Sequence, residues 1–113
     1  MNSAVINPES PPVVVPIGKS GENIAQIIVI DCTKWHRRYG AGTITLQYRR
    51  PEEEQAYAVS TSTGEPTLTW RPTAYDLEKS GVAKAQVEFR AHNTIAKSPI
   101  FSLCIHKSLS RRA

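Results

Sequence analysis

The clearest signal in this sequence is a regular alternation of apolar and polar residues in two short stretches, residues 43–49 and 82–90, the second of which alternates from residue 83 onward. A period of two residues is typical of a strand with one face buried and the other exposed to solvent. We therefore expect two half-buried strands here. The residues predicted to face the core are Ile44, Leu46, Tyr48, Ala83, Ala85, Val87 and Phe89.

Other stretches predict further strands by different patterns. Residues 24–31 are apolar at nearly every position, which indicates a central strand covered on both faces. A β-branched run at residues 13–15 is stopped by Pro16 and suits a strand at a sheet edge. Shorter strands are expected at residues 56–59 and 67–71. Residues 94–106 predict a closing strand with a bend at Ser98 and Pro99.

Two short helical turns are expected between these strands. Trp35 and Tyr39 are four residues apart and would share one face of a turn within residues 31–39. Thr73 precedes Asp76 at the spacing of a helix cap, which predicts a second turn ending at Gly81. Short strands separated by Gly, Pro and Ser turns favour an all-β, antiparallel sandwich, immunoglobulin-like or jelly-roll-like. Its large core residues are predicted to be Trp35, Trp70, Phe89 and Phe101.

The chain of 113 residues divides into three parts. Residues 1–12 are Pro-rich and lack a strand pattern, so a flexible arm is expected there. Residues 13–107 form the sandwich, and 108–113 are a basic tail. No secretory signal or membrane-crossing apolar run is apparent, which predicts synthesis in the cytoplasm and no membrane partner. Cys32 and Cys104 are then expected to be unpaired thiols, although the sequence leaves a cross-sandwich disulfide open.

The formal net charge of +4 raises the question of a nucleic-acid partner. Such binding needs cations gathered on one surface. Basic residues here are interleaved with acidic ones along the chain, which is typical of a solvated surface, so no nucleic-acid partner is expected. The residues concerned are Arg37, Arg38, Arg49, Arg50, Arg71, Lys84, Arg90, Lys97, Lys107, Arg111 and Arg112 against Glu52, Glu53, Glu54, Glu78 and Glu88.

Motifs for catalysis or metal binding are weak. Gly18-Lys19-Ser20 resembles the end of a phosphate-binding loop, but Val13 stands where that loop needs glycine. The glutamates of residues 52–54 lie in a charged turn, where they would repel one another. Four possible zinc ligands match no common zinc spacing; they are Cys32, His36, Cys104 and His106. We expect no catalytic residue, metal or cofactor, and a protein that is not an enzyme.

Several segments together resemble the N-terminal domain of phage baseplate upper proteins and tail-fibre proteins of Gram-positive phages and prophages. The resemblance covers about residues 22–106. It rests on residues 31–35 (DCTKW), 44–51 (ITLQYRRP), 68–70 (LTW) followed by 73–76, Gly81 before 85–89 (AQVEF), and 95–101 (IAKSPIF).

The resemblance implies a β-sandwich that anchors a longer fibre or receptor-binding protein to a baseplate, usually as an oligomer. It implies structural roles and no catalytic ones. Trp35 would seal one end of the sandwich, Trp70 would fill its middle, and Ser98 would bond backbone left open at the bend before Pro99. Gly81 would adopt a positive φ at a helix end. Phe89 is a further structural position of the family.

The resemblance predicts a phage tail or baseplate protein made in the bacterial cytoplasm and then built into the virion, with other tail proteins as partners. The sequence continues only to Ala113, without a fibre or receptor-binding head. We therefore expect either a free-standing accessory tail protein or a homologous domain put to another use. The alternative is a carbohydrate- or cell-surface-binding sandwich. It would use the aromatic residues nearest the turns, Tyr57 and Tyr75.

Overall fold

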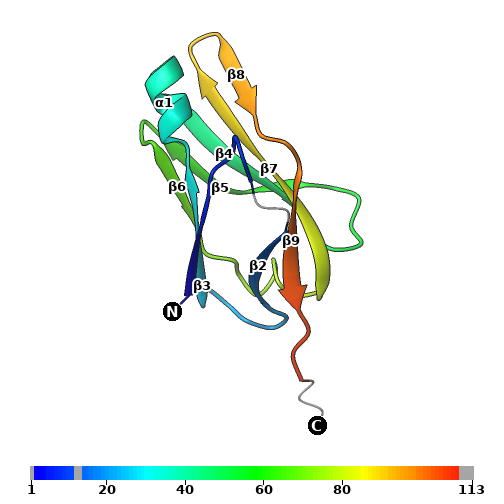
Figure 1. The fold of residues 1–113 in the computed structure, drawn as a ribbon. Coiled ribbons are helices and arrows are strands. Elements are labelled where there is room, and N and C mark those ends of the chain that lie inside the picture. The colour runs from blue at the N-terminus through cyan, green and yellow to red at the C-terminus, as the bar shows by residue number, and fades with distance from the viewer. Residues whose placement is uncertain (1, 12–13, 110–113) are drawn as a thin grey trace.

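The computed structural model describes residues 2–11 and 14–109. Within these ranges the chain forms nine strands and one short helix (Figure 1). They are β1 (Asn2–Ile6), β2 (Val14–Lys19), β3 (Gln26–Asp31), α1 (Thr33–Tyr39), β4 (Thr43–Arg49), β5 (Tyr57–Thr63), β6 (Thr67–Trp70), β7 (Gly81–Ala91), β8 (Thr94–Lys97) and β9 (Phe101–His106). The predicted all-β class is confirmed.

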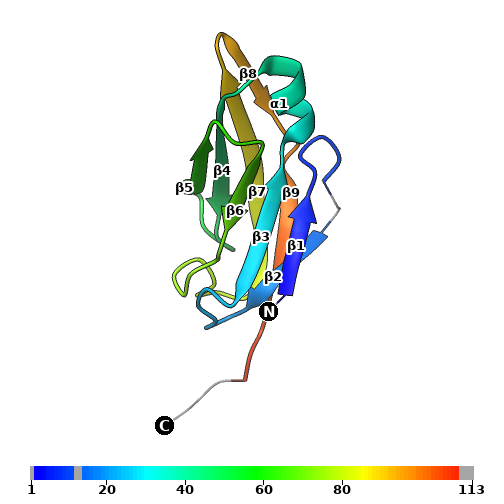
Figure 2. The ribbon, with the colours of Figure 1, turned by 90° about the vertical axis from the view of Figure 1, so that its left-hand side faces the viewer.

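The strands form two sheets that pack as the layers of a sandwich (Figure 2). The small sheet has the order β1-β3-β6, and the large sheet has the order β2-β9-β7-β4-β5. The long strand β7 pairs with β9 along its first half and with β8 along its second half. Buried side chains of both sheets meet in one core. Its members include Ile28, Ile30, Ile44, Leu46, Tyr48, Leu68, Trp70, Val87 and Phe89.

Aromatic contacts join the helix to this core. Trp35 and Tyr39 of α1 both approach Phe89 of β7, with ring centroids 6.0 and 6.4 Å from it. The prediction that these two residues share a helical face is therefore confirmed. Further down the sandwich, the ring of Trp70 lies 4.9 Å from that of Tyr48. Phe101 at the start of β9 is also buried, so large apolar groups occupy the core from end to end.

The direction of strand pairing corrects one expectation. The sandwich is not purely antiparallel, because β1 runs parallel to β3 and β2 runs parallel to β9. Parallel neighbours need a crossover connection. The chain provides it by passing from the small sheet to the large one between β1 and β2, and back between β2 and β3. Local patterns of apolar residues carry no information about such pairings.

Three local expectations are also wrong. Asn2–Ile6, placed in a strandless arm, forms β1. Among its side chains with described burial, those of Ala4, Val5 and Ile6, only Ile6 is deeply buried, so these residues show no clear alternation. Strand β2 continues past Pro16, which an edge strand tolerates. Residues 73–80 form turns instead of a helix. The predicted capping contacts nevertheless form, since the Thr73 N–H donates to Asp76 Oδ2 over 3.0 Å.

Gly81 and Ser98 lie at two turning points of the chain. Gly81 has φ +129° and is the first residue of β7, so its positive φ follows a turn and not a helix. Ser98 lies between β8 and β9, where its own N–H donates to Val87 O over 2.9 Å. Its hydroxyl accepts from Val87 N–H over 2.9 Å and donates to Pro99 O over 2.8 Å. Residues 98–100 form a bulge here, because these three residues lie opposite only two residues of β7, 86 and 87. The Ser98 hydroxyl thus replaces a strand carbonyl at the bulge.

Replacing Ser98 with Ala is expected to lower the free energy of unfolding by about 1–3 kcal/mol, because the buried Val87 N–H loses its acceptor. Urea unfolding followed by tryptophan fluorescence measures the loss. Ser80→Ala is the matched control: Ser80 is exposed, and we expect a change within about 0.5 kcal/mol. Equal effects of the two substitutions would mean that the Ser98 bonds do not stabilise the bulge.

Candidate interaction surface

The outward face of the large sheet carries a continuous group of side chains near one end of the sandwich. Inward and outward residues alternate along β7, so Val82, Lys84 and Gln86 point away from the core. Strand register then places Arg49, Lys84, Ser102 and Val14 in one row across four strands. We name this group the outer-face patch: Val14, Pro16, Gln47, Arg49, Val82, Lys84, Gln86, Ile100, Ser102 and Cys104.

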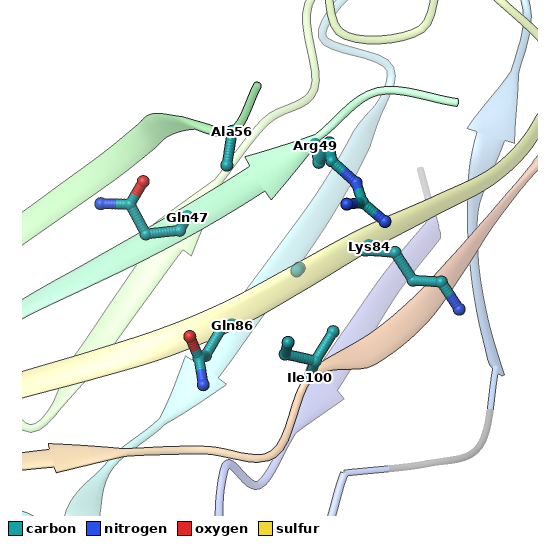
Figure 3. Close-up of a pocket in the computed structure, with 7 residues that line it drawn as sticks. Gln47, Arg49, Ala56, Lys84, Gln86 and Ile100 are labelled. Carbon is teal, nitrogen blue, oxygen red and sulfur yellow. The ribbon is translucent and has the colours of Figure 1, made fainter. Parts of the chain in front are cut away.

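A shallow hollow of about 140 Å³ lies within the outer-face patch (Figure 3). Gln47 and Arg49 border it from β4, Lys84 and Gln86 from β7, and Ile100 from the bulge after Ser98. The bulge matters because it turns Ile100 outward, where 68% of the residue is exposed. The hollow therefore combines an apolar wall with two amides and two cations, which suits a protein segment better than a small apolar ligand.

The two cations of the hollow lack carboxylate partners. Arg49 stands directly opposite Lys84 in the strand register. The Lys84 ammonium donates to Ser102 Oγ over 2.7 Å, and neither cation belongs to a salt bridge within the described residues. Elsewhere on the same face, Glu88 is paired with Arg90 and Lys97 at 2.9 and 3.8 Å. The hollow thus holds two neighbouring positive charges without local compensation.

A second polar cluster surrounds the buried carboxylate of Asp76. Tyr57 donates its hydroxyl to Asp76 Oδ1 over 2.6 Å, and Trp70 Nε1 donates to Oδ2 over 3.3 Å. Tyr48 donates its hydroxyl to the backbone O of the same residue over 2.8 Å. The guanidinium of Arg50 donates to the Tyr75 carbonyl and to Glu78. Each of these polar groups has a hydrogen-bond partner within the cluster, which indicates a structural role.

The two tyrosines proposed for glycan binding lie next to each other, but they do not form a flat platform. Their ring centroids are 5.8 Å apart, and the ring planes are inclined to each other at 64° in an edge-on arrangement. Tyr57 is half-buried, while Tyr75 is 58% exposed. The Arg50 guanidinium lies 4.1 Å from the Tyr75 ring centre and covers one face of it. A sugar that stacks on both rings at once needs their exposed faces to lie in roughly one plane. The two tyrosine rings do not meet this condition.

Stability is expected to fall as the pH rises above about 10, the ordinary pKa of tyrosine. Burial, together with the bond to Asp76, raises the pKa of Tyr57, and burial raises that of Tyr48. Above pH 10 the unfolded chain releases these protons while the folded chain retains them, so unfolding becomes more favourable. Melting temperatures of the wild type and of Tyr57→Phe measure this; the variant should show a shallower alkaline decline. Identical slopes would contradict it.

The fold has a counterpart among solved structures. The N-terminal domain of phage TP901-1 ORF48 matches 95% of this chain and 100% of that chain, with a TM-score of 0.59 and 14% sequence identity. The fold is shared with a phage protein. At this identity the likeness establishes the fold alone, and at that level it confirms the resemblance to a phage N-terminal domain. No protein-family description and no curated protein sequence matches the chain.

The candidate metal ligands do not come together. Within residues 2–11 and 14–109, no three His, Cys, Asp or Glu residues are grouped so as to hold a metal ion. Cys32 and Cys104 are both unpaired thiols, Cys32 buried and Cys104 half-buried on the outer face of β9. The same described residues include no helix long and apolar enough to cross a membrane.

Cys104 is expected to react with iodoacetamide well before Cys32. Burial raises the pKa of the Cys32 thiol to about 12, so its thiolate is scarce at neutral pH and shielded from reagent. Peptide mass spectrometry of timed reactions at pH 8 separates the two sites, because each cysteine falls in its own tryptic peptide. Denatured protein serves as the control and should label both. Faster labelling of Cys32 in the folded protein would contradict its burial.

The outer-face patch is the feature that sequence reasoning missed. Val14, Val82 and Ile100 lie far apart in the chain, and only strand register brings them to one surface. The one available signal was the alternation within residues 82–90, which places Val82 and Lys84 on the outward face. In an alternating strand, an apolar residue at an outward position, such as Val82, is a sequence signal of an interaction surface.

Proposed function

We propose that this chain is a non-enzymatic structural module of a phage tail or baseplate, which binds other tail proteins during assembly and stays in the virion. The observation that carries this proposal is the fold match, because it spans the whole of a phage N-terminal domain. The resemblance at residues 31–35, 44–51 and 95–101 points in the same direction. Fold alone does not fix function, so an experiment must decide.

The test is quantitative mass spectrometry of purified phage particles from the host that encodes this chain. The proposal expects the chain in virions at a fixed ratio to the other tail proteins, and expects deletion of its gene to leave tails incomplete by electron microscopy. Virions that are complete and infective without the chain would overturn it. Selective binding on a glycan array, lost on Tyr57→Ala with Tyr75→Ala, would favour the carbohydrate-binding alternative instead.

We further propose that the module is oligomeric in the assembled tail. Support comes from the edge strands of the large sheet: among the described residues, β2 and β5 each pair with a single strand in the order β2-β9-β7-β4-β5, and β5 is further joined to β6 by the Ser60 hydroxyl, which donates to Thr69 O over 2.8 Å. An unpaired edge offers backbone groups to another chain. Light scattering of the purified chain, and its copy number per virion, measure this directly. One copy per tail would contradict it.

A further inference from the structure

Exposed apolar side chains gather on the outer-face patch. Val14, Val82 and Ile100 are 49%, 54% and 68% exposed and are three of the eight large apolar residues exposed in the described residues. They lie on or beside the adjacent strands β2, β7 and β9, and Val14, which pairs with Ser102, is two register positions from both Val82 and Ile100. Pro16 and Cys104 continue the group along the row of Val82. A contiguous apolar group marks an interaction surface where scattered single residues do not.

Charge defines what this surface can accept. Arg49 and Lys84 border the apolar group as cross-strand neighbours, without a carboxylate partner in the described part of the chain. Two adjacent cations repel each other, and a carboxylate placed between them would relieve that repulsion. The amides of Gln47 and Gln86 stand opposite each other beside the cations. Gln86 already donates one amide hydrogen to Ser98 O over 2.8 Å, and the remaining amide groups can donate to a carboxylate or pair with a backbone.

We propose that the outer-face patch is the docking surface for a second tail protein of different sequence, which presents apolar side chains beside an aspartate or glutamate. The proposal rests on the function proposed above and adds to it a location and a partner chemistry. The apolar row of β2, β7 and β9 supplies buried area. Arg49 and Lys84 select the partner by charge, since complementary charges speed encounter and like charges exclude wrong partners.

A second copy of this chain fits the surface poorly. In a face-to-face pair, each outer-face patch would meet the cations of the other copy. The carboxylate that β7 places on this same face is Glu88, and it is already paired with Arg90 and Lys97. Self-association through this face would therefore bring like charges together. A face-to-face pair thus offers no free carboxylate from β7, which favours a partner of another sequence.

The experiment adds the recombinant chain to tail particles purified from phage deleted for its gene. Bound chain is separated by sedimentation and quantified by mass spectrometry. We expect wild-type chain to bind and its Cys104 to become protected from iodoacetamide, because Cys104 lies in the patch between Pro16 and Val82. Cys32, which is buried in the free chain as well, serves as the internal control.

Charge reversal identifies the surface. Arg49→Glu with Lys84→Glu is expected to lower particle binding by about tenfold or more. The matched control is Lys34→Glu with Arg37→Glu on α1, at the opposite end of the sandwich (Figure 1). It makes the same charge change and should bind like the wild type. All four positions lie on the surface rather than in the core, and equal melting temperatures of the two variants verify that both fold.

The outcomes separate the two proposals. If the wild-type chain binds no tail particle, the proposed function fails and this proposal falls with it. If the wild type binds but Cys104 stays reactive, or the Arg49/Lys84 variant binds as well as the α1 variant, the function stands and the docking surface is wrong. A dimer of the pure chain that protects Cys104 and dissociates on Arg49→Glu would make the occupant a second copy and would also overturn it.

Discussion

Replacing Phe89 with Ala is expected to lower the free energy of unfolding by about 3–5 kcal/mol. The side chain is fully buried and lies between α1 and the large sheet, with the rings of Trp35 and Tyr39 within 6.4 Å of its own. Its removal leaves a cavity between a helix and a sheet, which cannot close without moving one of them. Domains are stable by about 5–15 kcal/mol, so this variant would be close to unfolding at 25 °C.

Guanidinium unfolding followed by near-ultraviolet circular dichroism measures this loss and reports on Trp35 at the same time. Phe89→Leu is the control, because it keeps most of the buried apolar volume and should cost about 1–2 kcal/mol. Val82→Ala, at an outward position of the same strand, should change stability by less than about 0.5 kcal/mol. A cost below about 1 kcal/mol for Phe89→Ala would contradict the packing of α1 on β7.

Replacing Asp76 with Ala is expected to cost about 3 kcal/mol or more, by a different mechanism. Its carboxylate accepts three hydrogen bonds, from the Tyr57 hydroxyl, Trp70 Nε1 and the Thr73 N–H. Removal leaves these donors without an acceptor in a region where water has little access, and each buried unpaired group costs about 1–3 kcal/mol. Thermal unfolding measures the loss, and intrinsic fluorescence reports the changed surroundings of Trp70.

The variant Asp76→Asn separates the effect of losing hydrogen bonds from the effect of losing side-chain volume. The amide keeps one acceptor oxygen and the size of the side chain, so this variant should lose less than half of what Asp76→Ala loses. Its amide nitrogen cannot accept from the second donor. Combining Asp76→Ala with Tyr57→Phe should be less than additive, because the two changes remove the same hydrogen bond. Full additivity would mean that Tyr57 and Asp76 do not interact in solution.

The spacing of apolar residues along the chain predicted the strands and the helix in which one face is buried. Strands β4 and β7 alternate because one face of each is buried, and α1 shows its Trp35 and Tyr39 spacing because both residues contact Phe89. Strand β1 was missed, since Ile6 is the one deeply buried residue among residues 4–6, and a single residue has no period. The parallel pairings of β1 with β3 and of β2 with β9 were also missed, because pairing direction depends on contacts distant in sequence.

The same limit governs the candidate site. Tyr57 and Tyr75 were proposed from their closeness to turns, and they do lie side by side, yet the bond from Tyr57 to Asp76 could not be foreseen from spacing. The outer-face patch needs residues from β2, β4, β7, β9 and the bulge at Ser98. Each of these residues looks unremarkable within its own segment. Whether they lie together on one surface depends on strand register, which is a property of the whole sheet.

The parallel pairing of β2 with β9 has a consequence for biosynthesis. Ser20 and Ser108, which follow these two strands, are 88 positions apart and hydrogen-bonded. A pairing this distant in sequence closes late and slowly, because the ends must first find each other. During synthesis on the ribosome, the edge of β2 that pairs with β9 would remain unpaired until His106 has emerged from the exit tunnel. During that interval the unpaired edge of β2 is open to pairing with another chain.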